Sequence, residues 1–311
     1  MNTPPIALSP PRNRPALSTV AELLKPITWF PPMWAFACGA VASGQDIGSH
    51  WALLVLGLVL TGPLVCASSQ AVNDWFDRHV DAINEPHRPI PSGRMPGRWG
   101  LGIAVSWTLL SLVWATLMGP WGFAACGLAI ALSWAYSAPP LRLKSNGWWG
   151  NAACGLSYEG LAWLTGTAVM LGGAWPGPYC LALALLYSVG AHGIMTLNDF
   201  KAIEGDLRMG IASLPVQLGA KGAARVACGL MVLAQLAVVL LLAFWQLPWH
   251  AAAVLALTLA QWPLMLKFLQ QPVERALHVS AFGVPLFVSG MMVSAWGLRQ
   301  LQPLQQLLEA T

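Results

Sequence analysis

The sequence predicts an all-α polytopic membrane protein: nine transmembrane helices in a bundle of two related four-helix units plus one helix. Three observations predict this fold. Of the 311 residues, 56% are hydrophobic and only 9% are charged, whereas soluble proteins average about 25% charged residues. Charge-free runs repeatedly exceed the length of about 20 residues that spans a bilayer, and the longest extends from Trp99 to Leu141. Basic residues also gather in alternate loops. This composition excludes a soluble enzyme, a disordered chain and a nucleic-acid binder.

Glycine and proline clusters divide the longest apolar runs into helical hairpins. Turns are expected at 118–122, 172–178 and 246–250. Isolated proline and glycine residues elsewhere are compatible with spanning helices, because neighbouring helices can satisfy the freed backbone groups. The predicted helices are 26–44, 51–74, 99–118, 121–137, 150–171, 179–200, 223–245, 249–268 and 279–298.

The distribution of basic residues predicts the topology. All of the 16 Lys and Arg residues except Arg299 fall in the N-terminal segment or in alternate loops. Because basic loops stay on the cytoplasmic side, the N-terminus is expected in the cytoplasm and the C-terminus in the periplasm. Residues 1–25 are expected to form a disordered cytoplasmic arm that is neither a signal nor a transit peptide. Residues 26–300 would form a single transmembrane domain and residues 301–311 a short tail, in a bacterial inner membrane.

Two polar segments on the cytoplasmic side share a pattern. Residues 73–94 and 198–208 both begin with Asn-Asp-aromatic after an apolar helix, 125 positions apart (198 minus 73). This similarity indicates a weak internal repeat of two four-helix units.

The acidic residues of these segments are spaced as metal ligands. Asn73, Asp77 and Asp81 recur every four residues and therefore share one face of a helix. Asp199 and Asp206, seven apart, also share a face, which Glu204 joins only if the helix ends at Gly205. Two carboxylates about 4 Å apart repel by about 4 kcal/mol at an effective dielectric constant near 20. Oxygen ligands favour a hard cation, Mg²⁺ before Zn²⁺.

The neighbouring basic residues suit an anion, since Mg²⁺ completes its coordination shell with phosphate and water. They are Arg78, Lys201 and Arg208. An apolar bundle beneath such a site can hold a hydrocarbon tail, so the combination indicates a polyprenyl diphosphate. An ordinary solvated loop of mixed charge is the alternative.

Three segments carry a resemblance to a known family. NDWFDRHVDAINEPHRPIPSGRM (73–95), NDFKAIEGDLRMGIASLPVQLG (198–219) and YSAPPLRLKSNGWWGNAACGLSYEGLAW (136–163) resemble the UbiA superfamily of intramembrane prenyltransferases, and its (bacterio)chlorophyll synthases in particular. The resemblance covers roughly residues 20–300. It implies nine helices, a cytoplasmic active site, Mg²⁺ dependence and prenyl transfer.

The resemblance also implies roles for individual residues. Asn73, Asp77 and Asp81 would hold one Mg²⁺, and Asp199 and Asp206 a second. Many relatives have an Asp where this chain has Ala202, so Asp199 or Glu204 would substitute. Lys144 is expected to act with Asp77, Asp81 and Asp206 in catalysis. The residues expected to contact diphosphate are Lys25, Tyr136, Ser137, Lys144 and Arg142.

Three further residues are expected at the substrate. Arg88 adjoins the Pro89–Gly93 turn, which forms either a lid or a plain loop. Glu159 is the only carboxylate deep in a predicted helix and should face the bundle interior, because a charge in the bilayer is costly. His192 either ligates the central Mg of a pigment or is a satisfied interior group.

The resemblance implies esterification of the propionate of bacteriochlorophyllide or chlorophyllide with geranylgeranyl or phytyl diphosphate, releasing pyrophosphate. It leaves open contacts with other pigment-biosynthesis proteins. Two alternatives are a UbiA-type prenyltransferase for a quinone or haem precursor and, in a different class, a secondary transporter. Clustering of the acids at one surface argues against the transporter.

Overall fold

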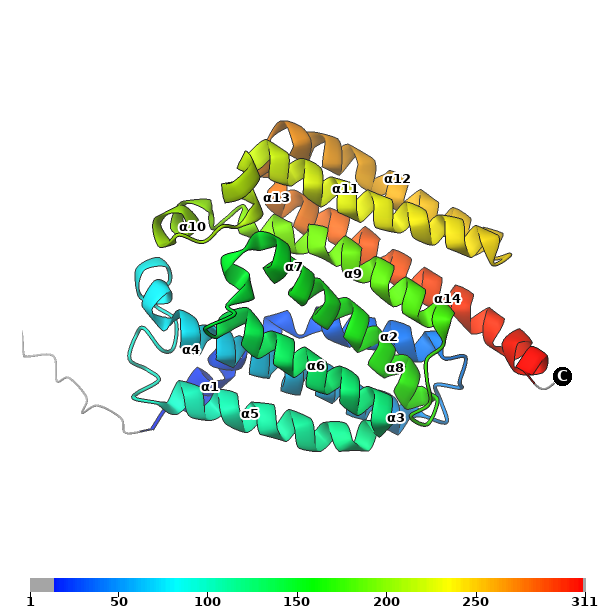
Figure 1. Cartoon of the computed structure of the whole chain (residues 1–311), viewed down its shortest axis with the longest axis horizontal. Coiled ribbons are helices and arrows are strands. Elements are labelled where there is room, and N and C mark those ends of the chain that lie inside the picture. The colour runs from blue at the N-terminus through cyan, green and yellow to red at the C-terminus, as the bar shows by residue number, and fades with distance from the viewer. Residues whose placement is uncertain (1–13, 310–311) are drawn as a thin grey trace, which may run out of the picture.

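The computed structural model describes residues 14–309, and all regular elements in this range are helices apart from one isolated bridge between Asn146 and Ala212 (Figure 1). The fold class predicted from the sequence is therefore confirmed as all-helical. The α-helices are α1 (Leu17–Leu24), α2 (Phe30–Ala42), α3 (Trp51–Val59), α4 (Ala67–Asn84), α5 (Trp99–Ala115), α6 (Gly119–Ser137), α7 (Gly147–Gly155), α8 (Ala162–Met170), α9 (Pro178–Asp199), α10 (Ile203–Met209), α11 (Leu214–Phe244), α12 (Pro248–Gln270), α13 (Pro272–His278) and α14 (Val284–Glu309).

Three long rods are each built from two α-helices joined by a π-helical segment. The segment Leu60–Cys66, which contains Pro63, joins α3 to α4. Leu156–Leu161 joins α7 to α8, and Val279–Gly283 joins α13 to α14. Such π segments occur frequently at functional sites, and the apolar runs of the sequence do not reveal them.

Within residues 14–309, helices overlap all nine predicted ranges, and six stretches are long and apolar enough to cross a membrane. The count falls below nine because α2 has only 13 residues and because α5 and α6, joined by a tight turn, form one stretch. The stretch spanning α7 and α8 is not among the six. The six stretches are Trp51–Ile83, Trp99–Ser137, Pro178–Asp199, Leu214–Phe244, Pro248–Gln270 and Pro272–Leu301.

The terminal segments differ from the sequence prediction. Part of the expected disordered arm, residues 17–24, forms helix α1, and Leu23 and Leu24 of this helix are buried. Arg94 donates two hydrogen bonds to the Glu22 carboxylate, at 2.5 and 2.7 Å, which ties α1 to the segment after α4. The rest of the expected arm, residues 1–13, lies outside the described residues. In place of a separate tail from residue 301, α14 continues to Glu309; residues 310–311 also lie outside the described range.

Helices α2 and α8 pack closely in the core because both carry glycine at the contact. A Cβ atom on Gly39 would lie 1.9 Å from the Trp163 carbonyl oxygen, and one on Gly166 would lie 2.1 Å from the Phe36 carbonyl oxygen. Thr167 donates a hydrogen bond to the Gly39 carbonyl at 2.8 Å across this contact. Small residues that allow backbones to approach are typical of helix contacts in membranes.

The two ends of the bundle differ in character (Figure 1). Helices α1 and α10 lie at one end, and the turn between α11 and α12 lies at the other. Several tryptophans at helix termini are exposed, including Trp51 at the start of α3 and Trp249 at the start of α12. Exposed tryptophans at helix ends are typical of the two membrane–water interfaces.

Candidate active site

The first acidic motif lies on a helix, as its four-residue spacing predicts, although this helix extends ten residues beyond the predicted range 51–74. Helix α4 continues to Asn84, so Asn73, Asp77 and Asp81 occupy successive turns of one face. The Asn73 amide donates a hydrogen bond to the Asp77 carboxylate at 3.0 Å, which confirms that these two side chains lie together. It also donates to the Ser137 hydroxyl at 3.4 Å, which brings α6 to the same site.

Basic residues from outside α4 pair with its acids. Lys25 follows α1 in a left-handed conformation (φ 47°) and binds the buried Asp74 carboxylate at 2.5 Å. Arg88 binds Asp81 at 2.9 Å and Asp74 at 3.5 Å. Arg88 is therefore held over α4.

Asp77 is bound by two cations from the loop that follows α6. Lys144 forms an ion pair with the Asp77 carboxylate, and Arg142 donates to it at 3.4 Å. Burial lowers the pKa of Lys144, and the negative charge of Asp77 opposes this shift. The fold thus places three predicted site residues, Asp77, Arg142 and Lys144, in direct contact.

The second motif is divided between two helices, so the expectation that Asp199 and Asp206 share a helix face is wrong. Helix α9 ends at Asp199, and α10 begins at Ile203 with Ala202 as its N-cap. The Asp199 carboxylate accepts a hydrogen bond from Asn151 of α7 at 3.1 Å. The loops before α7 and after α10 are joined by hydrogen bonds, from Ala212 to the Ser145 carbonyl at 2.9 Å and from Gly147 to the Ala212 carbonyl at 2.8 Å.

Lys144 electrostatically links the two motifs. Burial raises the pKa of Asp206, and the positive charge of Lys144 opposes the rise. Lys144 therefore attracts Asp206 as well as Asp77. Glu204, by contrast, is mostly exposed and pairs with Arg208 at 2.5 Å on the surface of α10.

The donors available to a metal ion are oxygen atoms in two groups. Within residues 14–309, no three His, Cys, Asp or Glu side chains are placed together as one metal cluster. The acids instead contact lysine and arginine side chains, and the Asp74 Oδ2 atom is buried without a partner. Asparagine and carboxylate oxygens fit Mg²⁺, which is usually bound by one or two carboxylates together with substrate phosphate.

A cavity of about 590 Å³ opens beside these groups. Such a volume is within the range of small-molecule sites, about 300–1,000 Å³. Its polar end includes Asn73 and three cations, Lys25, Arg88 and Lys201. The predicted residue Tyr136 also lines it. About two helical turns from Asn73 and Tyr136 the lining includes the apolar residues Val65 and Ala129, and the hydroxyl or amide groups of Gln70, Ser133 and Tyr158 also line the cavity.

Other predicted site residues lie away from this cavity. Arg78 stacks on the Trp75 ring, 4.3 Å from its centroid, and donates to the Trp75 carbonyl at 2.6 Å. Arg208 forms an ion pair with Glu204 on the surface of α10. Glu159 is 5% exposed, which confirms that it lies in the interior, and its Oε2 atom has no partner. His192 is also interior, with Nε2 3.1 Å from the Trp148 carbonyl and Nδ1 unpartnered.

Some residues of the site were not singled out from the sequence. Asp74 was passed over because it is off the face shared by Asn73 and Asp77, yet it is the acid that holds Lys25. Its place in the Asn-Asp pair was the available signal. Asn151 carries no comparable signal, because its contact with Asp199 joins residues 48 positions apart.

Comparisons with known proteins show the family to which the chain belongs. The UbiA prenyltransferase family matches residues 29–291. The chain is 52% identical over 294 residues to the bacteriochlorophyll synthase 33 kDa chain of Cereibacter sphaeroides, covering 94% of this chain and 97% of the relative. It is 40% identical to the chloroplastic chlorophyll synthase of Oryza sativa subsp. japonica, covering 88% and 75%. The fold resembles a UbiA homologue from Archaeoglobus fulgidus bound to DMAPP and Mg²⁺, with a TM-score of 0.66, 20% identity and coverage of 91% and 99%.

The chain belongs to the UbiA family of prenyltransferases. Within that family its similarity extends over nearly the full length of a bacteriochlorophyll synthase subunit. This membership supports the resemblance seen in the three motifs and does not support the transporter alternative.

Proposed function

We propose that this protein esterifies the propionate of bacteriochlorophyllide or chlorophyllide with a geranylgeranyl or phytyl group taken from the corresponding diphosphate. The single observation that carries the proposal is the cavity beside α4, which is lined by three cations and, about two helical turns from Asn73 and Tyr136, by apolar side chains such as Val65 and Ala129. A prenyl diphosphate has the same division into a charged head and an apolar tail. Similarity to bacteriochlorophyll and chlorophyll synthases supports the choice of acceptor over a quinone or haem precursor.

The charged head would lie against Lys25, Arg88 and Lys201, which line the cavity. Mg²⁺ would be held by Asn73, Asp77 and Asp81 of α4 and by Asp199 and Asp206 across the site. When bound, Mg²⁺ neutralises charge on the diphosphate and makes it a better leaving group. Glu204 is outside this proposed ligand set because it pairs with Arg208 on the surface.

Group transfer needs no base to remove a proton from the acceptor. A propionate is already ionised at neutral pH, because an ordinary carboxyl pKa is near 4. The C1–O bond of the prenyl diphosphate breaks, its electron pair leaves with pyrophosphate, and a propionate oxygen forms the new bond to C1. Cations such as Lys25 stabilise the leaving group, and the ring face of Tyr136 can stabilise positive charge on the allylic carbon. The apolar walls keep water from competing with the propionate.

The same proposal includes the membrane arrangement. The chain would cross the bilayer nine times, with α2, α5, α6 and the α7–α8 rod each counted as one crossing. This arrangement would place the acidic motifs on the cytoplasmic face of a bacterial inner membrane. The alternation of basic loops supports this orientation. Proteins that supply or receive the pigment would meet the enzyme at that face or within the bilayer.

The test is to incubate membranes containing the protein with each chlorophyllide and each diphosphate, and to separate the pigments by chromatography. The proposal predicts an esterified pigment in at least one combination, dependent on added Mg²⁺. Transfer only to an aromatic quinone precursor, offered in parallel, would assign the protein to a different acceptor. Membranes without the protein serve as the control.

A further inference from the structure

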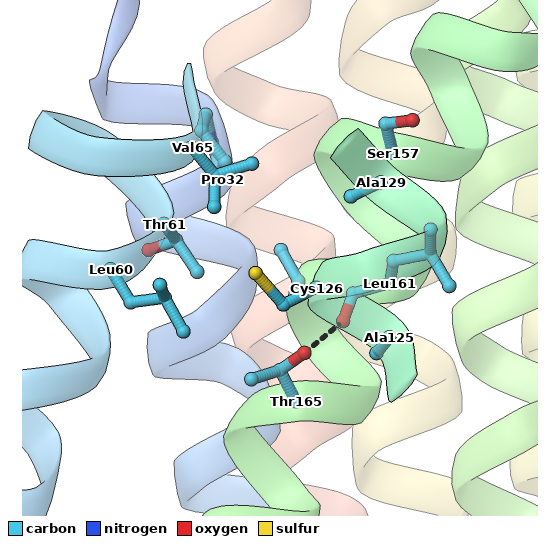
Figure 2. A pocket seen from close by; sticks show the side chains of 11 residues that line it. Pro32, Leu60, Thr61, Val65, Ala125, Cys126, Ala129, Ser157, Leu161 and Thr165 are labelled. Atoms are coloured by element: carbon cyan, nitrogen blue, oxygen red, sulfur yellow. Dashed lines mark hydrogen bonds between the residues drawn. The ribbon is translucent and has the colours of Figure 1, made fainter. Parts of the chain in front are cut away.

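A second, smaller cavity adjoins the first one. It has a volume of about 30 Å³, and three residues, Val65, Ala129 and Ser157, line both cavities. We call this second cavity the annex (Figure 2). Its remaining wall residues are Pro32, Leu60, Thr61, Ala125, Cys126, Leu161, Ala162 and Thr165.

The annex extends the main cavity away from the charged groups. Thr61 precedes Val65 by one helical turn, Cys126 precedes Ala129 by about one turn, and Leu161 follows Ser157 by about one turn. In the α3–α4 rod, in α6 and in the α7–α8 rod, each of these steps leads away from the end of the helix that lies near the charged groups. One turn rises about 5.4 Å, so the twelve positions between Asn73 and Thr61 place the annex up to about 18 Å from the metal-binding face.

Two of the polar residues in the wall of the annex, Thr61 and Thr165, have their hydroxyl groups bound within their own helices. The Thr61 hydroxyl donates to the Gly57 carbonyl at 3.0 Å. The Thr165 hydroxyl donates to the Leu161 carbonyl at 2.7 Å, the dashed line in Figure 2. Both hydroxyls are thus satisfied within their own rods. A hydrocarbon group, which makes no hydrogen bonds, suits this part of the wall, because neither threonine hydroxyl needs a hydrogen-bond partner from the occupant.

Two of the π-helical segments contribute to the annex. Leu60–Cys66 supplies Leu60, Thr61 and Val65, and Leu156–Leu161 supplies Ser157 and Leu161. In Figure 2 the side chains of Leu60 and Thr61 lie on one side and that of Leu161 on the other, with the Cys126 sulfur between them. Because π segments are rare and frequently mark functional sites, their pairing here is independent support for a binding role.

We infer that the annex receives the hydrocarbon end of the prenyl chain and that Cys126 limits the length of chain that the enzyme uses well. This inference rests on the proposed function and adds the part of the site that selects among diphosphates. With the charged head held by Lys25 and Arg88, an extended chain must run along the apolar wall toward Val65, and the annex is the space beyond it. Cys126 is 4% exposed, lines the annex, and its side chain lies between those of Thr61 and Leu161 in Figure 2.

A substitution that fills the annex tests the inference. Cys126→Leu should lower the ratio of kcat/KM for geranylgeranyl diphosphate over geranyl diphosphate at least about tenfold, because excluding two buried methylene groups is worth that factor. Cys228→Leu makes the same change at another buried cysteine, in α11 and outside both cavities. It should leave the ratio unchanged. An unchanged ratio in folded Cys126→Leu would overturn the inference.

A second measurement uses the unaltered protein and does not depend on a variant folding. Geranylgeranyl diphosphate carrying a photoreactive diazirine at its hydrocarbon end should crosslink to peptides containing residues 60–65 or 125–129. Crosslinks confined to α11–α14 would refute the inference even if prenyl transfer is observed. Failure of the unaltered protein to transfer any prenyl group would instead refute the proposed function, while the crosslink would still report where the chain binds.

Discussion

Replacing Asp77 by asparagine removes the charge at the centre of the proposed metal site. Asp77 contacts Asn73, Arg142 and Lys144, so its carboxylate stands where the amide, the cations and a metal ion would meet. Two unit charges 4 Å apart interact by about 4 kcal/mol at an effective dielectric constant near 20. If the unaltered enzyme makes that interaction in the transition state and the variant does not, kcat/KM falls by about three orders of magnitude, since each factor of ten is about 1.4 kcal/mol.

The loss should be catalytic rather than structural, because Asp206 still attracts Lys144 in Asp77→Asn. The assay is the initial rate of pigment esterification at saturating Mg²⁺, with thermal unfolding in detergent measured on the same preparation. Asp46→Asn is the matched control: Asp46 is an exposed carboxylate in the loop between α2 and α3, and its loss should leave the rate unchanged. A folded Asp77→Asn protein with kcat/KM within about tenfold of the unaltered enzyme would refute the reasoning.

Three further changes have defined outcomes. Because burial lowers the pKa of Lys144, its charge is lost at a lower pH than that of an exposed lysine; Lys144→Arg, which stays charged, should move the alkaline limit of activity upward, and an unmoved limit would contradict this role. Ala202→Asp places a favoured capping residue at the N-cap of α10 and should preserve Mg²⁺-dependent activity; complete inactivation would count against it. Gly39→Val places a Cβ against the Trp163 carbonyl and should destabilise the fold by about 1–3 kcal/mol or more, measured by thermal unfolding against Gly127→Val, whose Cβ meets nothing within 4 Å.

The helices could be predicted from the sequence because an apolar run inside a membrane must satisfy its backbone hydrogen bonds within the run, and a helix does so. It also predicted that Asn73 and Asp77 share a face, since helix periodicity alone places them together. Helix α1 was missed because its eight residues lie between prolines and show no run long enough to span a bilayer. Its anchor, the pair formed by Glu22 and Arg94, joins residues 72 positions apart.

The second motif shows where periodicity stops being informative. The seven-residue spacing of Asp199 and Asp206 places them on one face only if the helix is unbroken, but α9 ends at Asp199. Their common environment depends instead on Lys144 and on the backbone hydrogen bonds of Ala212, which are tertiary contacts. The two π segments around the annex, one of which contains Pro63, are likewise not encoded by any hydrophobic pattern.

The most direct test of the central claim compares two acceptors with the purified protein, Mg²⁺ and geranylgeranyl diphosphate. One is the chlorophyllide or bacteriochlorophyllide that the membranes esterify, and the other is the methyl ester of its propionate. Mass spectrometry should detect addition of one prenyl group, with release of pyrophosphate, only for the free acid, because the ester has no ionised carboxylate to attack C1. Prenylation of the methyl ester at an equal rate would contradict carboxylate attack and assign the transfer to a carbon or phenol acceptor.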